Sequence, residues 1–158
     1  ARWTKHIIVR TCGLYARPGD ARAKNFVRTV LRLAGEGRRL RVVNDQRCTP
    51  SYVPHVARAV LFLAGLGEQQ GAAPWGIYHV TNRGETTWYR FACEIVRLAG
   101  LDVPVEPITS AEYAAAAQRP SYSVLDVSRY HSLGGPAMRD WEAALGEYFG
   151  QQVGSVGS

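Results

Sequence analysis

The sequence predicts a mixed α/β fold with more helix than sheet, organised as a single domain. Residues 6–11 form a short, continuously apolar, β-branched run, which is typical of a strand covered on both faces, as in a parallel sheet. Residues 23–33 and 88–98 instead place apolar side chains at helical spacing. With 158 residues, of which 46% are hydrophobic and 20% charged, the chain has the size and composition of one globular domain.

After the first strand, the first half of the chain is predicted to run loop, helix, strand, helix. Residues 14–21 form the loop, because a Pro-Gly pair inside them is a turn signal. The helix at 23–33 stops at the glycines that follow it. Residues 40–43 are predicted as a strand. A second helix begins near Pro54, which suits a first-turn position, and ends at the Gly-Leu-Gly of 65–67.

The second half begins with residues 76–82, which alternate like a strand with one buried face. A threonine N-cap then precedes the helix at 88–98. Two prolines make 103–108 at most an edge strand, because proline cannot donate to the ladder. The remaining predicted elements are a capped helix at 109–117, an extended segment at 119–126, an amphipathic helix at 137–149 and a flexible Gly/Ser-rich tail at 151–158.

The charge of the chain is basic but dispersed. The net charge is +6, and the one cluster is Arg38-Arg39-Leu40-Arg41. Because this cluster lies where a helix ends, its cations also offset the negative end of the helix dipole. We therefore expect a solvated structural role and no nucleic-acid partner. Binding of a nucleic acid through these residues would have to weaken steeply with salt, whereas a small anionic ligand remains compatible with the charge.

The three cysteines and the apolar runs bear on the cellular location. Cys12, Cys48 and Cys93 are widely spaced and match no pairing or metal-ligand pattern, which favours a reducing, cytoplasmic compartment. No apolar run approaches the length of a membrane span, and no signal peptide is visible. The chain begins without methionine and runs straight into a strand, so we expect it to be part of a longer polypeptide.

The segment 41–57 is the most polar connection between apolar elements. It passes from a strand through Asn, Asp, Gln, Arg, Thr, Ser and Tyr into a helix. Such loops often carry binding groups, although an ordinary strand-to-helix turn has the same composition. The sequence leaves both interpretations open.

A search for catalytic motifs finds none that is complete. The chain has no Gly-rich dinucleotide loop, no phosphate-binding loop, no paired metal motif and no nucleophile elbow. Its four histidines are scattered without ligand spacing. We therefore predict no metal site and no catalytic residue within the chain.

Four residues suit the binding of an anionic, hydroxyl-rich ligand. Arg119 precedes a proline, so a stiff backbone presents its guanidinium for bidentate phosphate contact, or for bonds to loop carbonyls. Asn25 lies at the first helix and suits either a phosphate or a helix cap. Tyr15 and Tyr52 can stack on a base or sugar, or anchor the loops as half-buried residues.

Eight short segments, in order across nearly the whole chain, resemble the C-terminal part of the dTDP-4-dehydrorhamnose reductase family, within the extended short-chain dehydrogenase/reductase superfamily. These segments are 8–15 (IVRTCGLY), 25–27 (NFV), 42–46 (VVNDQ), 49–52 (TPSY), 76–80 (GIYHV), 84–88 (GETTW), 119–126 (RPSYSVLD), and Gly135 followed by 141–145 (WEAAL).

The resemblance implies an α/β fold in which 6–11 is a late strand of a Rossmann sheet, and the rest of 1–150 is a small substrate-binding lobe. It also implies NADPH-dependent reduction of dTDP-4-dehydro-L-rhamnose to dTDP-L-rhamnose. NADPH, or NADH, would be bound mainly by an N-terminal half, which would also hold a Tyr and a Lys four residues apart. Neither this pair nor the Gly-rich loop occurs here, so the chain alone is expected to be inactive. A non-catalytic binding relative and another sugar-nucleotide reductase or epimerase remain alternatives.

The resemblance also assigns roles to single residues. Thr11 and Cys12 are expected near the nicotinamide, Gly13 in the sugar pocket, Asn25 at the diphosphate, and Arg119 at the diphosphate or the nucleotide. The expected nucleotide-sugar-binding site therefore consists of Gly13, Asn25, Arg119 and Tyr52.

The chain departs from the family pattern at three positions. Gly13 stands where the family often has Trp, and Cys48 and His55 replace a frequent Gly and Asp. An apolar first strand also invites association, so pairing of 6–11 with a second copy in a homodimer, or with the small sheet, is expected.

Overall fold

The structure is a computed structural model that describes residues 4–17, 25–69, 75–114, 117 and 119–150. The predicted loop at 14–21 and the tail at 151–158 therefore lie partly or wholly outside the described residues. The elements are β1 (Ile7–Arg10), β2 (Leu14–Tyr15), α1 (Phe26–Gly35), β3 (Leu40–Val43), β4 (Arg47–Cys48), β5 (Ser51–Tyr52), α2 (Val53–Gln69), β6 (Gly76–His79), β7 (Thr86–Thr87), α3 (Trp88–Leu98), β8 (Val105–Ile108), α4 (Ser110–Tyr113), α5 (Ser128–His131) and α6 (Trp141–Tyr148).

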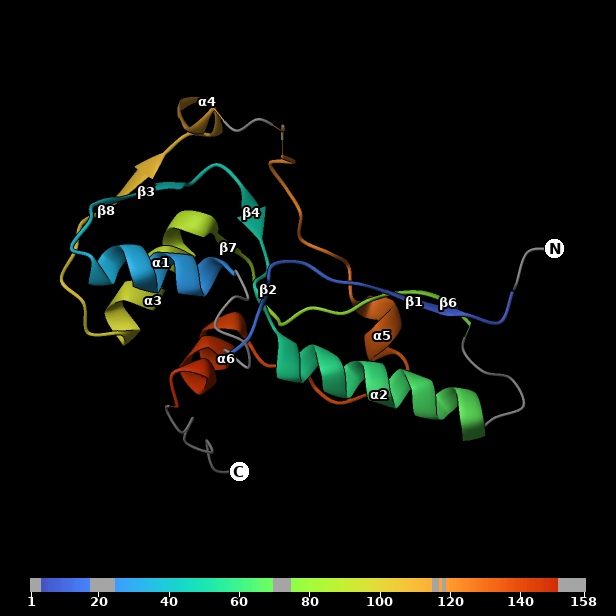
Figure 1. Cartoon of the computed structure of the whole chain (residues 1–158). Coiled ribbons are helices and arrows are strands. Elements are labelled where there is room, and N and C mark those ends of the chain that lie inside the picture. Colours follow the sequence, from blue (N-terminus) through green and yellow to red (C-terminus); the bar gives the residue numbers. More distant parts are fainter. Residues whose placement is uncertain (1–3, 18–24, 70–74, 115–116, 118, 151–158) are drawn as a thin grey trace.

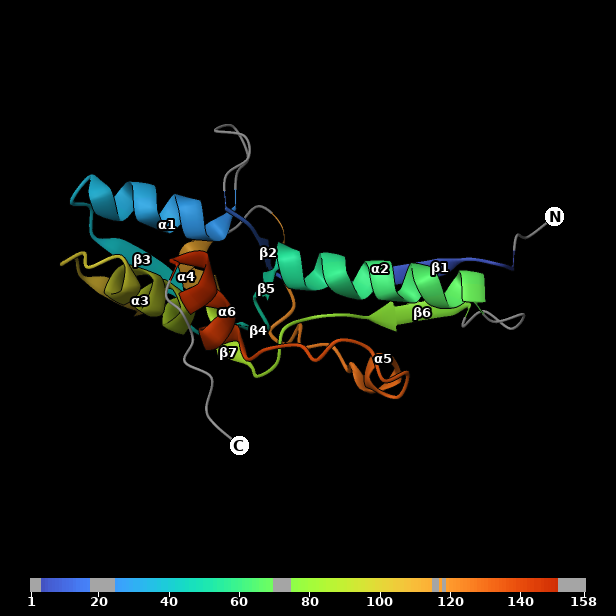
Figure 2. The ribbon, with the colours of Figure 1, turned by 90° about the horizontal axis from the view of Figure 1, so that it is seen from below.

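The molecule is elongated, with a lobe at one end and an arm at the other (Figure 1, Figure 2). In the lobe, α1 and α3 pack on each other and on the parallel pair β3–β8, in which Leu40 lies opposite Val105. In the arm, α2 runs along the parallel pair β1–β6, and α5 packs beside β6. Within the described part of the chain, no helix is long and apolar enough to cross a bilayer.

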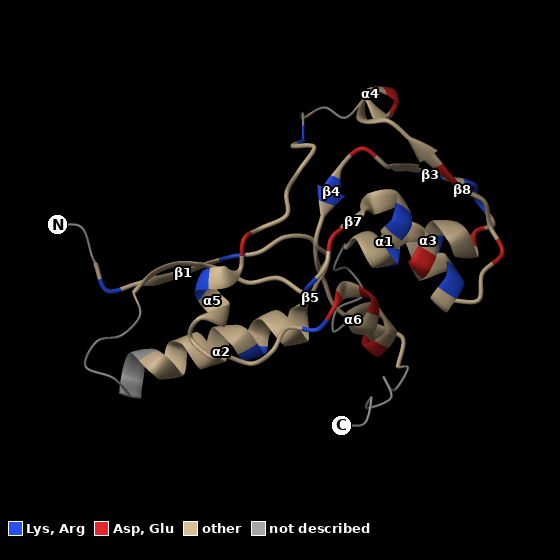
Figure 3. Ribbon diagram, turned by 180° about the vertical axis from the view of Figure 1, so that it is seen from behind, with Lys and Arg blue, Asp and Glu red and all other residues tan. Residues whose placement is uncertain are grey.

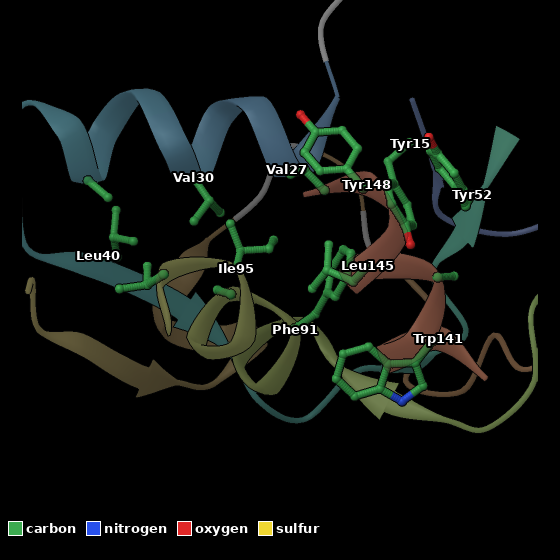
Figure 4. Packing of buried hydrophobic residues seen from close by; sticks show 14 residues of the cluster. Tyr15, Val27, Val30, Leu40, Tyr52, Phe91, Ile95, Trp141, Leu145 and Tyr148 are labelled. Atoms are coloured by element: carbon green, nitrogen blue, oxygen red, sulfur yellow. The ribbon is translucent and has the colours of Figure 1, made fainter. Parts of the chain in front are cut away.

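The core of the lobe is aromatic and lies between α1, α3 and α6 (Figure 4). Phe91 and Ile95 of α3 are fully buried there, and Tyr15 stacks on Tyr52 with ring centroids 5.4 Å apart. Burial of each large apolar side chain contributes about 1.5–3 kcal/mol to stability. The amphipathic stripes of these helices therefore hold the lobe together, as the sequence predicts for 88–98.

Two short strand pairs join the lobe to the arm. β2 pairs in parallel with β5, and β4 pairs antiparallel with β7. The polar segment 41–57 is thus not one open loop but contains two short strands. Sequence patterns did not predict these strands, because two residues are too few to show a period.

A buried polar cluster also crosses this junction. Asn82 is 1% exposed and His55 is 4% exposed. The Asn82 side chain accepts from the Tyr52 N–H at 2.8 Å, and its Nδ2 donates to His55 Nδ1 at 2.9 Å and to the Arg139 carbonyl at 2.8 Å. Since His55 Nδ1 accepts, its Nε2 carries the proton and donates to Glu147 at 3.0 Å. One amide and one imidazole therefore tie α2, the segment after β6 and α6 together.

Two helix predictions in the second half of the chain need correction. The helix predicted at 109–117 is only α4, which ends where Ala114 adopts a left-handed conformation with φ 46°. The segment 103–108, expected to be an edge strand or barely a strand, is confirmed as an edge strand, because β8 pairs with β3 in a two-stranded sheet and its prolines lie where no ladder N–H is needed. The last helix, expected from 137, begins at Trp141.

Candidate functional site

The lobe contains a large hollow beside β3. Its volume is about 1540 Å³, and it is bounded by α1 and β3 on one side and by the segment from α4 to Tyr122 on the other. In Figure 1, α4 lies above β3, and the described chain that follows residue 119 runs down toward α5. The aromatic lining comes from Phe26, Trp88, Tyr113 and Tyr122.

Hydrogen bonds fix the far wall of the hollow to β4. The Arg47 N–H donates to the Ser121 carbonyl at 2.7 Å, and the Ser123 N–H donates to the Arg47 carbonyl at 2.9 Å. Glu85 adds a second tie, because it pairs with the Arg47 guanidinium and accepts from the Tyr122 hydroxyl at 3.2 Å. The predicted extended segment 119–126 is therefore held in place by β4 as well as by its proline.

The α4 end of the hollow is held by a carboxylate. Asp45 accepts from the Ser110 N–H at 2.9 Å and from the Ser110 hydroxyl at 2.7 Å, and these bonds lower the pKa of Asp45. Gln46 donates to the same hydroxyl at 2.8 Å. Thr109 and Glu112 form a capping box, whose hydrogen bonds lower the pKa of Glu112. Asp45 and Gln46, both from the segment 41–57, thus build the wall of the hollow.

Four arginines line the hollow, and they differ in how they are paired. Arg39 pairs with Glu106 at 2.8 Å, and Arg38 and Arg41 lie 3.9 Å from Glu36 and Glu112. These acidic partners support the structural role expected for the cluster at 38–41.

Arg119 is the fourth of these arginines, and it forms no ion pair with any of the described residues. Its guanidinium is exposed and remains available for an anion.

Asn25 and Gly13 lie next to the hollow but do not line it. Asn25 is the N-cap of α1, accepting from the Arg28 N–H at 3.0 Å and donating to the Ala16 carbonyl at 3.2 Å. Both ends of its amide are engaged, and its neighbour Phe26 lines the hollow. Gly13 has φ +57°, and a Cβ there would lie 3.3 Å from the Trp88 indole. The glycine thus allows Trp88 to pack directly on the backbone.

Tyr52, by contrast, belongs to the core. It is 5% exposed, stacks on Tyr15 and does not line the hollow. Tyr15 is still more buried, at 1% exposed. Both tyrosines therefore lie where loop anchors are expected, and anchoring is one of the two roles that the sequence left open for them.

Thr11 and Cys12 follow the carboxyl end of β1. The Thr11 hydroxyl oxygen is buried and has no hydrogen-bond partner among the described residues. The Cys12 sulfur lies 3.7 Å from the Ser123 hydroxyl, next to the far wall of the hollow. Among the described residues, no group of three or more His, Cys, Asp and Glu is arranged to hold a metal ion.

Sequence reasoning missed the aromatic lining. Helical spacing predicted Phe26 on the apolar face of its helix, Trp88 was predicted only as the start of the helix at 88–98, and the centroids of the two rings lie 4.8 Å apart. Both, however, stand at the first residue of a helix, where one edge of the ring can reach a neighbouring hollow. An aromatic residue at the first position of a predicted helix is therefore the sequence signal that could have indicated this lining.

Cys48 is expected to be the least reactive thiol. It is fully buried, and burial together with the nearby Cys12 raises the pKa of the Cys48 thiol to about 12. Because the thiolate is the nucleophile, iodoacetamide at about pH 8 should modify the partly exposed Cys12 and Cys93 first. Mass spectrometry of timed samples measures this order. Equal rates for Cys48 and Cys93 in the folded chain would contradict the assignment, and equal rates in denaturant are the control.

Comparisons with a family model, with curated proteins and with solved structures all identify the same family. Residues 1–153 match the family model described as the RmlD substrate binding domain. The chain is 42% identical over 151 residues to a dTDP-4-dehydrorhamnose reductase of Streptomyces griseus, which covers 95% of this chain and 48% of the relative.

Two solved structures are also similar. A dTDP-4-dehydrorhamnose reductase from Clostridium acetobutylicum has a TM-score of 0.80 and 38% identity, covering 91% of this chain and 48% of that one. The enzyme from Bacillus anthracis, in complex with NADP, has a TM-score of 0.78 and 34% identity over 92% of this chain and 48% of that one. The chain thus spans about half the length of the relatives it matches. The family model covers nearly the whole chain, and the chain therefore belongs to the RmlD substrate binding domain family.

Proposed function

We propose that this chain forms the nucleotide-sugar-binding half of an NADPH-dependent reductase that converts dTDP-4-dehydro-L-rhamnose to dTDP-L-rhamnose. The observation that carries the proposal is the hollow of about 1540 Å³, in which Arg119 lies without an acidic partner among the described residues. A diphosphate is the part of a nucleotide sugar that a guanidinium binds best, through two parallel hydrogen bonds. Family membership supports the same class of ligand.

The remaining lining suits the uncharged parts of the ligand. Trp88 and Phe26 offer aromatic faces at one wall, and Tyr122 offers another across the hollow. Such faces stack on a base or on the apolar side of a sugar. Gly13 and Asn25 act from behind this wall, since Gly13 lets Trp88 pack on the backbone and Asn25 caps the helix that begins with Phe26. Tyr52 supports the site from the core.

The cofactor would lie at the carboxyl end of β1, where strands of an open α/β sheet present ligands. The buried Thr11 hydroxyl, which has no partner among the described residues, fits a group that bonds the cofactor, and Cys12 lies beside it. NADPH, or NADH, supplies the hydride when bound. The sequence contains no Tyr followed four residues later by Lys, so the proton donor and most of the cofactor site belong to a half that this chain does not span.

A titration of the chain with dTDP tests the proposal. Arg119→Ala should weaken dTDP binding by about 10–100-fold in calorimetry, because a charge-assisted bidentate contact contributes about 1.5–3 kcal/mol. Arg90→Ala is the matched control, since Arg90 lies on α3 outside the hollow. Absence of dTDP binding by the unsubstituted chain, or equal losses in both variants, would refute the assignment.

A reductase for a different dTDP-linked keto sugar is the second candidate. It is favoured by Gly13, which offers no side chain to a sugar beside Trp88. Comparison of the affinities for dTDP, dTDP-L-rhamnose and dTDP-D-glucose distinguishes the two candidates. A gain in affinity from the rhamnose moiety supports the first, and no gain supports the second.

A further inference from the structure

The backbone on both sides of Tyr122 is bonded to β4. Arg47 and Tyr122 form a parallel bridge, in which the Arg47 N–H donates to the Ser121 carbonyl at 2.7 Å and the Arg47 carbonyl accepts from the Ser123 N–H at 2.9 Å. The Ser123 hydroxyl donates to the same carbonyl at 3.0 Å. Because the backbone is held, the orientation of the Tyr122 ring depends on its two side-chain torsions.

Glu85 restricts these torsions, because its carboxylate accepts from the Tyr122 hydroxyl at 3.2 Å. The other carboxylate oxygen pairs with the Arg47 guanidinium, and Figure 3 shows the basic residue of β4 beside the acidic residue that leads into β7. The side chains of this ion pair are 55% and 37% exposed, so the pair contributes little to stability. Among the described residues, Tyr122 lines the hollow and Glu85 does not. The carboxylate thus holds an aromatic ring at the hollow from outside it.

The Arg47–Glu85 pair also connects the two aromatic walls of the hollow. Glu85 directly precedes β7, in which Thr87 lies opposite Arg47 and forms the N-cap of α3. Trp88, the first residue of α3, lines the hollow together with Tyr122. The segments that carry the two rings are therefore both bonded to Arg47, and their separation is fixed before a ligand binds.

The position of Tyr122 along the hollow indicates which part of a nucleotide sugar it meets. Arg119, the proposed diphosphate ligand, lies three residues before it, and three residues span at most about 10 Å. On the other side, the Ser123 hydroxyl lies 3.7 Å from the Cys12 sulfur. Cys12 follows the carboxyl end of β1, where the cofactor would lie. Since the hydride passes from the cofactor to the sugar, and the sugar is joined to the diphosphate, Tyr122 lies at the sugar end of the hollow.

We propose that Glu85 is a positioning residue for the sugar, because it holds the Tyr122 ring as a preformed stacking face beside the diphosphate site. The C–H groups of a sugar form an apolar face that packs on an aromatic ring. A ring that is already fixed loses less conformational entropy on binding than a mobile one. This inference rests on the proposed function and deepens it, since it assigns recognition of the sugar to Tyr122, which touches the ligand, and to Glu85, which acts through Tyr122.

Calorimetric titrations with dTDP, dTDP-L-rhamnose and dTDP-D-glucose test the proposal. In Glu85→Ala, the gain in affinity that the sugar adds to dTDP should fall by about 2–10-fold, the cost of immobilising one side chain on binding. The affinity for dTDP itself should change by less than about twofold, because the diphosphate site is separate. Tyr122→Phe, which keeps the ring but loses the hydrogen bond, should show the same selective loss. Glu85→Gln should restore most of the gain, since an amide oxygen still accepts from the hydroxyl.

A double-mutant cycle distinguishes positioning from a general structural effect. Tyr122→Ala removes the stacking face, so the addition of Glu85→Ala should cause no further loss of the sugar's contribution. Glu94→Ala is the matched control, because Glu94 pairs with Arg97 on α3 away from the hollow, and it should leave all three affinities unchanged.

Several results would overturn this inference alone, while dTDP binding that depends on Arg119 still supports the nucleotide site. They are an unchanged sugar contribution in Glu85→Ala, equal losses for dTDP and its sugars, additive losses in the cycle, and a gain in affinity from neither sugar. Failure of the unsubstituted chain to bind dTDP would refute the proposed function and this inference together.

Discussion

Replacement of Asn82 by alanine is expected to lower the free energy of unfolding by about 2–4 kcal/mol. The side chain is 1% exposed and makes three hydrogen bonds, to the Tyr52 N–H, to His55 Nδ1 and to the Arg139 carbonyl. Alanine leaves the Tyr52 N–H and His55 Nδ1 buried without a replacement, whereas the Arg139 carbonyl still accepts from the Arg83 N–H at 2.8 Å. An unsatisfied buried polar group costs more than the hydrogen bond itself contributes. Urea unfolding followed by circular dichroism measures the change.

Asn44→Ala is the matched control for this substitution. Asn44 is exposed and accepts one hydrogen bond, from the Thr87 hydroxyl at 2.8 Å. Its replacement should change stability by about 0.5 kcal/mol or less. If the two variants proved equally stable, the buried cluster would not hold the lobe and arm together.

Replacement of Gly135 by alanine is expected to destabilise the arm by about 1–3 kcal/mol through overpacking. A Cβ there would lie 2.7 Å from the Phe62 ring and 2.9 Å from the Tyr130 ring. Phe62 is only partly buried, but Tyr130 is fully buried and its hydroxyl donates to the Pro136 carbonyl at 2.9 Å. Tyr130 cannot move without losing that bond, so the strain remains in the folded state. A lower midpoint of thermal unfolding is the expected readout.

Gly35→Ala is the control, and it is expected to change stability in the opposite direction. Gly35 ends α1, and a Cβ there would have no neighbour within 4 Å. Alanine reduces the freedom of the unfolded chain and should stabilise the fold by about 0.4–1 kcal/mol. A destabilised Gly35→Ala together with an unaffected Gly135→Ala would show that close packing at Gly135 is not the controlling factor.

The local pattern of the sequence predicted the helices well where their apolar faces are regular. α3 has the predicted bounds of 88–98, and Thr87 is its N-cap. The helix predicted at 23–33 begins instead at Phe26, because Asn25 is the N-cap. The strand at 6–11 was identified from its β-branched run and forms β1 over Ile7–Arg10.

The sequence by itself also determined the family, because eight ordered segments carry it and residues 1–153 match its model. It also singled out Arg119 as a candidate binding residue, and Arg119 lines the hollow without an acidic partner among the described residues. A stiff backbone before a proline is a local property, so this assignment needed no tertiary contact.

Only the tertiary structure decided how the polar residues are used. Asp45 bonds Ser110, which lies 65 positions away, and His55 bonds Glu147, which lies 92 positions away. The same holds for Glu85, which accepts from Tyr122 at a separation of 37 positions, and for the placement of Tyr52 in the core. Hydrophobic periodicity fixes which face of an element is buried, because it repeats within a few residues. A hydrogen-bond partner distant in the chain leaves no such repeat, so folding alone determines whether a polar side chain braces the protein or faces a ligand.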